Sequence, residues 1–381
     1  MGRNASGKFC RNGIGIGTCA ARANQLKAPP ANPTQIMPKA ERIKLIEAIQ
    51  QKRGTHLIAY VTSTRQNMEV AMAMDSIRKI YEHLRLIGSA NKRSSVDLFL
   101  HSNGGDGTVP WRLVTLIREF SDQFSVLVPH RAFSAATLTA LGADSIVMHP
   151  MGMLGPTDPT VSNPFNPRDP AHPERQIGIS VEDVTAYLAL IREDAGIQHE
   201  DQVILAFNKL AEMVHPLALG NVKRSLSQSR MMARKLLALH MNPAKNEHKI
   251  DEIVDNLTSK LFYHGHPINR EEAKKGVGLS TIKYPPADVE DLMWRLYQEY
   301  EAETKMEQPF QLAMEFVSQF PNLAPGGSAI TPTATAKLAF IESTSRTDVH
   351  GIDYQLVGQK APNGTTNVTM INNRQGWTIE P

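Results

Sequence analysis

Three parts of residues 96–159 decide the fold: VDLFLHSNGGDG (96–107), FSVLVPHRAFSAATLTALGADSIVM (124–148) and MGMLGPTDP (151–159). Two short apolar runs each end at a turn that contains glycine or serine, and each turn opens a segment with helical character. This repeated strand–turn–helix pattern places backbone N–H groups and one serine hydroxyl at neighbouring edges of a parallel sheet. Such an arrangement suits chemistry on a carbonyl group.

The same alternation extends outward from this stretch. Strands are predicted at 56–62, 96–100, 125–128 and 146–148, and helices at 39–52, 68–87, 111–120 and 134–141. Alternating strands and helices indicate an α/β fold with a parallel sheet covered on both faces. Right-handed crossovers place the carboxyl ends of the strands at one edge, where active sites of open sheets lie. We expect Ser102–Gly107 and His130–Ser134 to meet there.

Four regions are expected along the chain. Residues 1–36 are rich in Gly, Ala, Asn and Pro without apolar periodicity, which predicts a flexible N-terminal arm. Residues 37–305 should form the main α/β domain, interrupted at 149–173 by a loop with seven prolines. Residues 306–333 should form a helix and a linker, and 334–381 a small C-terminal β segment of four short strands. Within the main domain, helices are also predicted at 181–194, 200–214, 217–240, 250–262, 269–275 and 288–303.

The composition is that of a soluble globular protein, with 41% hydrophobic and 21% charged residues. A net charge of +3 is too small to predict nucleic-acid binding. Cys10 and Cys19 are the two cysteines, which favours a reducing compartment, and we expect a cytoplasmic protein. The sequence has no run of about 18 apolar residues, so no membrane span is predicted.

The sequence also predicts no cofactor. It contains no GxxxxGK phosphate loop, so ATP hydrolysis by this chain is not expected. Among its 13 histidines, His264 and His266 stand two residues apart, but no cysteine or acidic ligand accompanies them at a zinc spacing. We therefore expect no metal.

Ser134 follows the apolar run SVLVP and precedes AATLTALGA, a segment of small residues. In one interpretation Ser134 is an N-cap, whose hydroxyl accepts a hydrogen bond from a first-turn N–H, and position alone favours this role. In the other it is a nucleophile. Ala135 and Ala136 then allow a second backbone to approach, and the helix N-terminus favours an anion nearby.

Asn103-Gly104-Gly105 form the second turn. Paired glycines can serve a turn that needs positive φ. They can also expose backbone N–H groups, and one of these, together with the N–H of Ala135, could bind a carbonyl oxygen as it becomes an oxyanion. Loss of one such donor typically costs about 3 kcal/mol of transition-state stabilisation. The presence of both turns, each after a parallel strand, favours the catalytic interpretation more than either turn alone.

These motifs resemble a known family. The Gly-Gly turn, AFSAATLTALGADSIVM (132–148) and LGPTDP (154–159) resemble the Clp-protease/crotonase fold, and more closely its serine dehydrogenase proteinase group, which is related to signal peptide peptidase A. HPLALGNVKRS (215–225) and HGHPINREEAKKGVGL (264–279) are also similar to that group. The resemblance implies a core of repeated ββα units with a helical extension. It also implies a serine peptidase that acts on peptides or proteins.

The resemblance further implies roles for individual residues. Ser134 would be the nucleophile, and the N–H groups of Gly105 and Ala135, beside Gly104, would form the oxyanion hole. Similar proteins assemble into rings or stacked oligomers, so a homo-oligomer is expected, with a possible unfoldase or adaptor partner.

The general base is not evident from the sequence. A serine hydroxyl is a poor nucleophile until a neighbouring group accepts its proton. Clp proteases place a histidine about 25 residues after the serine, where this sequence has Thr157-Asp158-Pro159. Related membrane peptidases use a lysine some 40 residues on, but the first lysine after Ser134 is Lys209. The remaining candidates for the base are His215, Lys223, His264 and His266, and Asp158 could orient a base.

Two alternatives to a peptidase stay open. A crotonase-type acyl-CoA enzyme also uses paired N–H groups as an oxyanion hole but needs no serine nucleophile. A catalytically inert assembly protein would have kept the fold and lost the base.

Overall fold

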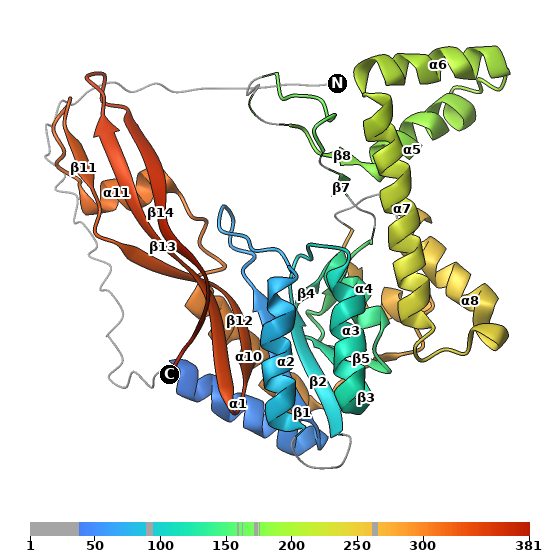
Figure 1. Ribbon diagram of the computed structural model, residues 1–381, viewed down its shortest axis with the longest axis horizontal. Coiled ribbons are helices and arrows are strands. Elements are labelled where there is room, and N and C mark those ends of the chain that lie inside the picture. The colour runs from blue at the N-terminus through green and yellow to red at the C-terminus, as the bar shows by residue number, and fades with distance from the viewer. Residues whose placement is uncertain are drawn as a thin grey trace, which may run out of the picture. The chain divides into compact units, whose positions relative to one another are not determined.

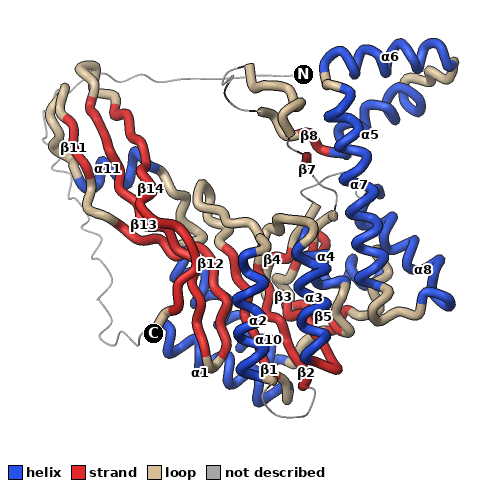
Figure 2. Tube along the Cα trace, viewed as in Figure 1, coloured by secondary structure: helices blue, strands red, loops and turns tan. Residues whose placement is uncertain are grey.

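A mixed β-sheet forms the centre of the computed structural model (Figures 1 and 2). Among the described residues it has nine strands, in the order β10-β5-β3-β2-β1-β12-β13-β11, with β14 paired to β13. The parallel part contains β1 (His56–Thr62), β2 (Ser94–His101), β3 (Ser121–Val128), β5 (Ser145–Met148) and β10 (Ile282–Lys283). The antiparallel part contains β11 (Ser328–Ile330), β12 (Ala334–Ser343), β13 (Arg346–Lys360) and β14 (Thr366–Ile379). The predicted α/β class and the parallel order of the first strands are confirmed.

The structure describes residues 38–88, 94–157, 160–161, 163–170, 174, 176–260 and 266–381. These residues belong to one compact unit, residues 37–381. The predicted N-terminal arm lies outside the described residues, as do Asp158 and His264.

A second, smaller layer of extended backbone follows the ends of the parallel strands. It contains the sheet β4-β6-β9, made of Arg131–Ala132, Met153–Leu154 and Ile268–Asn269. Two isolated bridges belong to the same pattern, Met72 with Gly105 and Ser102 with Ala132. The first three parallel strands of the main sheet are therefore each followed by a short extended piece and then by a helix. This arrangement confirms the predicted repeat of ββα units.

Helices cover both faces of the main sheet (Figure 1). On one face α2 (Asp75–Ile87), α3 (Val109–Phe120) and α4 (Ala135–Leu141) pack on alternate strand residues such as Ile58 and Tyr60. On the other face α1 (Pro38–Arg53) and α10 (Ala287–Thr304) cover Leu57, Ala59 and Val61. Successive strand residues point to opposite faces, and helices bury both faces. This explains why the sequences of these strands are continuous apolar runs.

A helical extension follows the proline-rich loop. It contains α5 (Val181–Ala189), a π-helical turn (Leu190–Asp194), α6 (Glu200–Met213), α7 (Pro216–Leu237), α8 (Pro243–Asp255), a second π-helical turn (Asn256–Lys260) and α9 (Arg270–Lys275). The short strands β7 (Thr160–Val161) and β8 (Ile179–Ser180) precede it, and α11 (Leu312–Gln319) precedes the C-terminal strands. The C-terminal half of α7 enters the main core through Ala233, Leu236 and Leu237. The N-terminal half packs on α5 instead.

One predicted helix begins later than its apolar pattern suggested. The prediction of a helix over 68–87 is wrong for residues 68–74, because α2 begins at Asp75. Met72 instead donates its N–H to the Gly104 carbonyl at 2.8 Å, and its own carbonyl accepts from the Asp106 N–H at 2.9 Å. Met68 and Met72 are buried in this extended segment. Their apolar spacing is the same as that of a helical face, which is why the sequence predicted a helix here.

The C-terminal strands are longer and fewer than predicted. Within residues 334–381, three strands replace the four short ones expected, because the last two predicted strands are joined in β14, which stays paired with β13 through Arg374 and Gln375. β13 begins at Arg346, and its polar residues Thr347 and Asp348 are buried rather than breaking it. β12 pairs antiparallel with β1, with Tyr60 opposite Ile341. These strands therefore continue the central sheet of their own chain.

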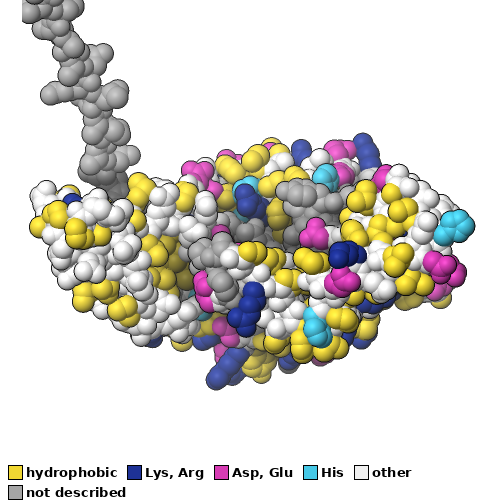
Figure 3. All heavy atoms as spheres, turned by 90° about the horizontal axis from the view of Figure 1, so that it is seen from above, with side chains coloured by type: hydrophobic (Ala, Val, Ile, Leu, Met, Phe, Trp, Pro, Cys, Tyr) yellow, Lys and Arg dark blue, Asp and Glu magenta, His cyan; other side chains and the backbone are white. Residues whose placement is uncertain are grey.

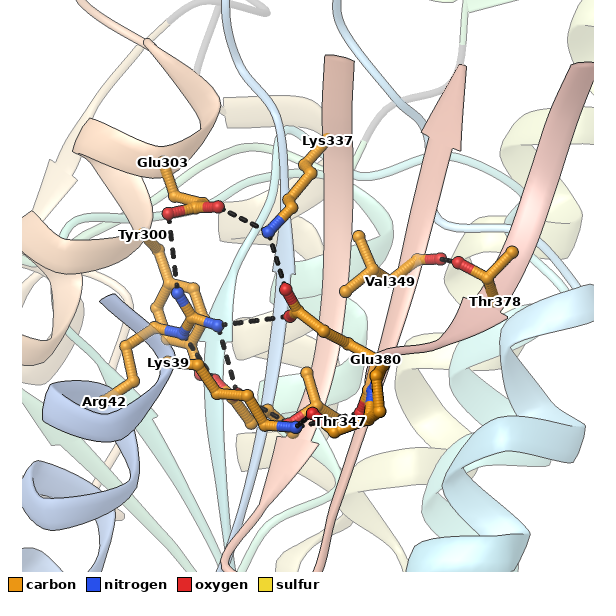
Figure 4. A network of polar contacts seen from close by, with 11 residues as sticks. Lys39, Arg42, Tyr300, Glu303, Lys337, Thr347, Val349, Thr378 and Glu380 are labelled. Atoms are coloured by element: carbon orange, nitrogen blue, oxygen red, sulfur yellow. Dashed lines mark hydrogen bonds and ion pairs between the residues drawn. The ribbon is translucent and has the colours of Figure 1, made fainter. Parts of the chain in front are cut away.

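A buried network of charges fixes the C-terminal strands to α1 and α10 (Figure 4). The Arg42 guanidinium and the Glu342 carboxylate are both fully buried, and Arg42 Nε lies 2.7 Å from Glu342 Oε2. The Tyr300 hydroxyl donates to the same carboxylate at 2.7 Å, and Thr347 at 2.8 Å. Lys337 extends the network to Glu303 and Glu380. Because these residues are far apart in sequence, their pairing depends on the complete fold.

Candidate functional site

Ser134 sits in a strained turn between β4 and α4. Its backbone has φ 50° and ψ −114°, a combination that L-residues rarely adopt and that costs about 1–3 kcal/mol. Its side chain makes no capping hydrogen bond. The N-cap interpretation of Ser134 therefore does not describe this geometry. A strained serine whose hydroxyl is not used by its own helix is typical of the turn that presents a nucleophile.

Gly104 packs directly against this turn. It has φ 98°, and a Cβ atom there would lie 2.6 Å from the Phe133 carbonyl oxygen and 2.9 Å from the Ala135 nitrogen. The Gly104 N–H donates to the Ser102 hydroxyl at 3.0 Å, and that hydroxyl also accepts from Thr62. The N–H of Gly104 is therefore occupied, and the role of Gly104 here is close packing.

The adjacent Gly105 is held by the extended segment before α2. A Cβ atom on Gly105 would lie 2.3 Å from the Met72 carbonyl oxygen, so only glycine fits. Met72 donates its N–H to the Gly104 carbonyl and accepts the Asp106 N–H, so in the described structure the N–H of Gly105 has no acceptor. The N–H of Ala135 likewise has none. Two unpaired backbone donors thus lie in the two turns that the sequence singled out.

Ser134, Gly105 and Ala135 line one cavity of about 430 Å³. The rest of its described wall consists of Asn103, Asp106, Gly107, Leu138, Thr157, Ser225, Gln228 and Ser229. The last three come from α7, about 90 residues beyond Ser134 in the sequence. The structure therefore brings the serine and both candidate donors together and adds a polar wall that sequence reasoning missed.

Buried threonine and serine hydroxyls hold the parts of this cavity in place. The Thr137 hydroxyl lies 2.6 Å from the Ala132 carbonyl and 2.9 Å from the Gly155 carbonyl, and it accepts the Gly155 N–H at 3.1 Å. Ser229 of α7 donates to the Thr157 carbonyl at 2.5 Å. The loop 155–157 is thus connected to both α4 and α7.

The candidate bases that are described lie away from the cavity. His215 is the N-cap of α7, where its Nδ1 accepts the Leu217 N–H at 3.2 Å and its ring stacks on Phe165. It precedes Ser229 by 14 residues, a distance of roughly 20 Å along a helix. Lys223 lines a different cavity, between α5, α6 and α7. His266 Nε2 lies 2.7 Å from Glu272 Oε1, and His266 does not line the Ser134 cavity as described. The described lining of the Ser134 cavity contains one ionisable side chain, Asp106, whose Oδ1 accepts from the Thr108 N–H and hydroxyl.

Three histidines gather beyond the same edge of the sheet but pack against α10. The rings of His101 and His130 stack at 5.7 Å, and His130 Nδ1 lies 2.8 Å from the Tyr297 hydroxyl. The His149 ring stacks on Trp294 at 5.1 Å. Burial, with the nearby charges of His130 and Arg131, holds the pKa of His101 well below its usual value.

Burial lowers the pKa of the other two histidines of this cluster as well. Burial, with the charge of Arg131, lowers the pKa of His130 to about 4. Burial also lowers the pKa of His149. None of the three lines the Ser134 cavity as described. The described residues also contain no group of three or more His, Cys, Asp or Glu side chains arranged to hold a metal ion.

Comparison with known proteins finds a family model that matches about half of the chain. A model of the ClpP-like SDH-type serine proteinases matches residues 28–216, about half of the 381 residues. The uncharacterized protein MJ0137 of Methanocaldococcus jannaschii is 27% identical over 263 residues, which cover 68% of this chain and 79% of that protein. The uncharacterized protein MJ1495 of the same organism is 23% identical over 258 residues, which cover 66% and 75%.

Solved structures are similar at low sequence identity. A variant of the 1510-N membrane-bound stomatin-specific protease is 14% identical, has a TM-score of 0.34, and covers 57% of this chain and 75% of its own. A probable enoyl-CoA hydratase/isomerase from Mycobacterium abscessus is 15% identical, has a TM-score of 0.28, and covers 71% and 81%.

The family match confirms the resemblance found in the sequence. It begins before α1 and ends at the start of α7, so it includes both turns of the cavity and the loop 155–157. Through residues 28–216, the chain belongs to the family of ClpP-like SDH-type serine proteinases.

Proposed function

We propose that this protein is a serine peptidase that cleaves peptide bonds through an acyl-enzyme on Ser134. One observation carries the proposal: the strained, uncapped Ser134 and the unpaired N–H groups of Gly105 and Ala135 line the same cavity. A nucleophile and two donors at one point suit the attack on a carbonyl carbon and the stabilisation of the oxyanion that results.

The proposed reaction has two steps. Ser134 Oγ attacks the carbonyl carbon while a base accepts its proton, and the oxyanion is bound by the N–H groups of Gly105 and Ala135. The C–N bond then breaks, the leaving amine takes the proton, and an ester remains on Ser134. Water, deprotonated by the same base, hydrolyses that ester and releases the acid.

We propose His264 as the base, with Asp158 as the residue that orients it. Asp158 directly follows Thr157, which lines the cavity, and the Thr157 N–H donates to the Leu257 carbonyl at 3.0 Å. The π-helical turn that contains Leu257 ends four residues before His264. After it, β9 pairs with β6 in the small sheet beside Ser134. Described chain on both sides of His264 thus reaches the cavity region, whereas His215 and Lys223 do not line it.

Partners and location are also proposals. We propose a homo-oligomer that takes peptide or protein substrates in the cytoplasm, with an unfoldase or adaptor as a further partner. Among the described residues, no helix by itself is long and apolar enough to cross a membrane, although α6 and α7 pass that test as a pair bent by 101°.

Digestion of β-casein by the wild type and by Ser134→Ala tests the reaction. The proposal predicts new peptides with the wild type and none with the variant. Single changes at Asp158, His215, Lys223 and His264 then test the base, and we expect His264→Gln and Asp158→Asn to abolish cleavage while Lys223→Met retains it. Cleavage by Ser134→Ala would overturn the nucleophile. Saturable binding of a CoA thioester without any cleavage would favour the acyl-CoA alternative instead.

A further inference from the structure

α6 carries apolar side chains that its own chain leaves exposed. No residue of α6 is buried in the described structure, yet the helix contains VILAF at 203–207. Leu205 is 68% exposed and Met213 is 73% exposed, and Ile204 and Phe207 are exposed as well. A helix with this much exposed apolar surface normally contacts a partner.

A cavity lies beside this helix, enclosed by α5, α6 and α7. Its volume is about 420 Å³, within the range of binding pockets. Its wall is almost entirely apolar and includes Leu188, Phe207, Ala211, Leu219, Gly220 and Lys223. Phe207 and Ala211 belong to the inner side of α6. Leu205 is two positions from Phe207, which places it on the opposite side of the helix.

Gly220 keeps this cavity open. It lies inside the 22-residue helix α7, where glycine costs about 1 kcal/mol relative to alanine. Its backbone does not require glycine, because its φ is not positive. Neither does packing within the chain, because a Cβ atom there would meet nothing within 4 Å. A glycine with no role in its own fold leaves room for a side chain from elsewhere.

The segment that contains α6 is mainly acidic, whereas the part of α7 from Lys223 onward is basic. Residues 181–217 contain seven acidic and two basic side chains, whereas 223–235 contain five basic and no acidic ones. Asp201 lies one turn before Leu205, and Lys223 lies in the cavity wall. In the described structure neither pairs with an opposite charge of its own chain. The acidic surface around α6 does not suit an anionic membrane, which attracts helices with a basic polar face.

We propose that a second copy of this chain docks here, with Leu205 of one copy entering the α5–α6–α7 cavity of the next and Asp201 facing Lys223. Figure 3 shows apolar and acidic side chains gathered at the end of the molecule that carries α5 and α6. Because the inserted helix and the receiving cavity are different surfaces, the contact is head-to-tail. Repetition of such a contact closes into a ring or extends as a filament. The inference specifies the surface of the proposed homo-oligomer and does not depend on catalysis.

The mass of the particle in solution tests the proposal. We expect the wild type to be larger than a monomer by light scattering after size exclusion. Leu205→Glu should raise the dissociation constant at least tenfold and give monomers, whereas Met314→Glu should not. Met314 is 66% exposed on α11 and provides a matched control for an added charge. Gly220→Leu, which fills the cavity, should also give monomers while the circular dichroism stays helical.

A mixture of the two variants tests the head-to-tail geometry. The Leu205→Glu chain has an intact cavity, and the Gly220→Leu chain has an intact Leu205. Leu205 of the second chain can therefore enter the cavity of the first, and no other such contact is intact. Mixing the two monomers should give a particle of two chains and no larger one. A monomeric wild type, equal masses for Leu205→Glu and Met314→Glu, or a mixture that stays monomeric would each overturn the proposal. Leu205-dependent binding to phosphatidylcholine vesicles by a monomeric wild type would assign α6 to a membrane. Ser134→Ala should assemble as the wild type does, so failure of the peptidase proposal leaves this test unaffected.

Discussion

Gly104 and Ser134 are packed so closely that a Cβ atom on Gly104 would lie 2.8 Å from the Cβ of Ser134. Gly104→Ala therefore adds a methyl group to the turn that carries the nucleophile, at a residue with φ 98°. We expect acylation of Ser134 to slow at least tenfold and the free energy of unfolding to fall by about 1–3 kcal/mol. Gly54→Ala adds the same group at another glycine of positive φ, 65°, where a Cβ atom meets nothing within 4 Å, and it should leave acylation unchanged. Equal acylation rates in the two variants would contradict the packing described for Ser134.

Removal of the Thr137 hydroxyl should lower the free energy of unfolding more than removal of the neighbouring Thr139 hydroxyl. Both are fully buried on α4, but the Thr137 hydroxyl joins β4 and the loop at Gly155, whereas the Thr139 hydroxyl donates only to the Ala135 carbonyl within its own helix, at 2.9 Å. Thr137→Val leaves buried backbone groups unpaired, at a cost of about 1–3 kcal/mol. Thr139→Val should cost less than about 1 kcal/mol. Urea unfolding of both variants measures the difference, and a larger loss for Thr139→Val would contradict it.

Arg42→Ala should destabilise the fold strongly. It leaves the fully buried Glu342 carboxylate without its cation, and the removal of one partner from a buried ion pair typically costs about 3–5 kcal/mol. Arg295→Ala is the matched control, because Arg295 is half exposed and pairs with Glu41 and Asp291 at the surface. That change should cost about 0–1 kcal/mol. Similar unfolding midpoints for the two variants would show that the Arg42 network does not hold the C-terminal strands.

Stability should fall as the pH falls below about 6.5. The pKa values of His101, His130 and His149 are lowered by burial, so in acid the unfolded chain binds protons that the folded chain does not. The stability is fully present above the unfolded pKa and is lost progressively toward the folded pKa, which for His130 is about 4. For the fully buried His101 the slope approaches about 1.4 kcal/mol per pH unit.

Urea unfolding at pH 8, 7, 6 and 5.5 checks this slope. His130→Gln should flatten it, whereas His199→Gln, which changes an exposed residue before α6, should not. Equal stability of the wild type at pH 8 and pH 5.5 would contradict the assignment of a neutral histidine cluster.

Local signals were sufficient for the core of the fold and for part of the site. The strands and helices around Ser134 follow from apolar runs and turn residues, and the Gly-Gly turn marks a place where two backbones meet. The extended path of Met72 could not be predicted in this way, because it depends on hydrogen bonds to Gly104 and Asp106 from another segment. Its apolar spacing resembles that of a helix, and the tertiary contact overrides that preference.

Long-range contacts explain what else the sequence could not reveal. Ser225, Gln228 and Ser229 form a wall of the cavity, but small polar residues on a long helix carry no motif that points to Ser134. Thr347 and Asp348 interrupt the apolar alternation of β13. In the fold Thr347 donates a hydrogen bond to Glu342, and Asp348 accepts one from Arg346. For the same reason, the choice among candidate bases depends on which segments the fold brings to Thr157.

Covalent labelling of Ser134 tests the central claim most directly. The full-length wild type and Ser134→Ala would be incubated with a biotinylated fluorophosphonate, which phosphonylates serines that have an active base and an oxyanion hole. Mass spectrometry of the digested protein would then locate the adduct. We predict one adduct, on the peptide that contains Ser134, and none in the variant. The account would be contradicted if the folded, oligomeric wild type carried no adduct on Ser134. It would also be contradicted if the same adduct formed in Ser134→Ala.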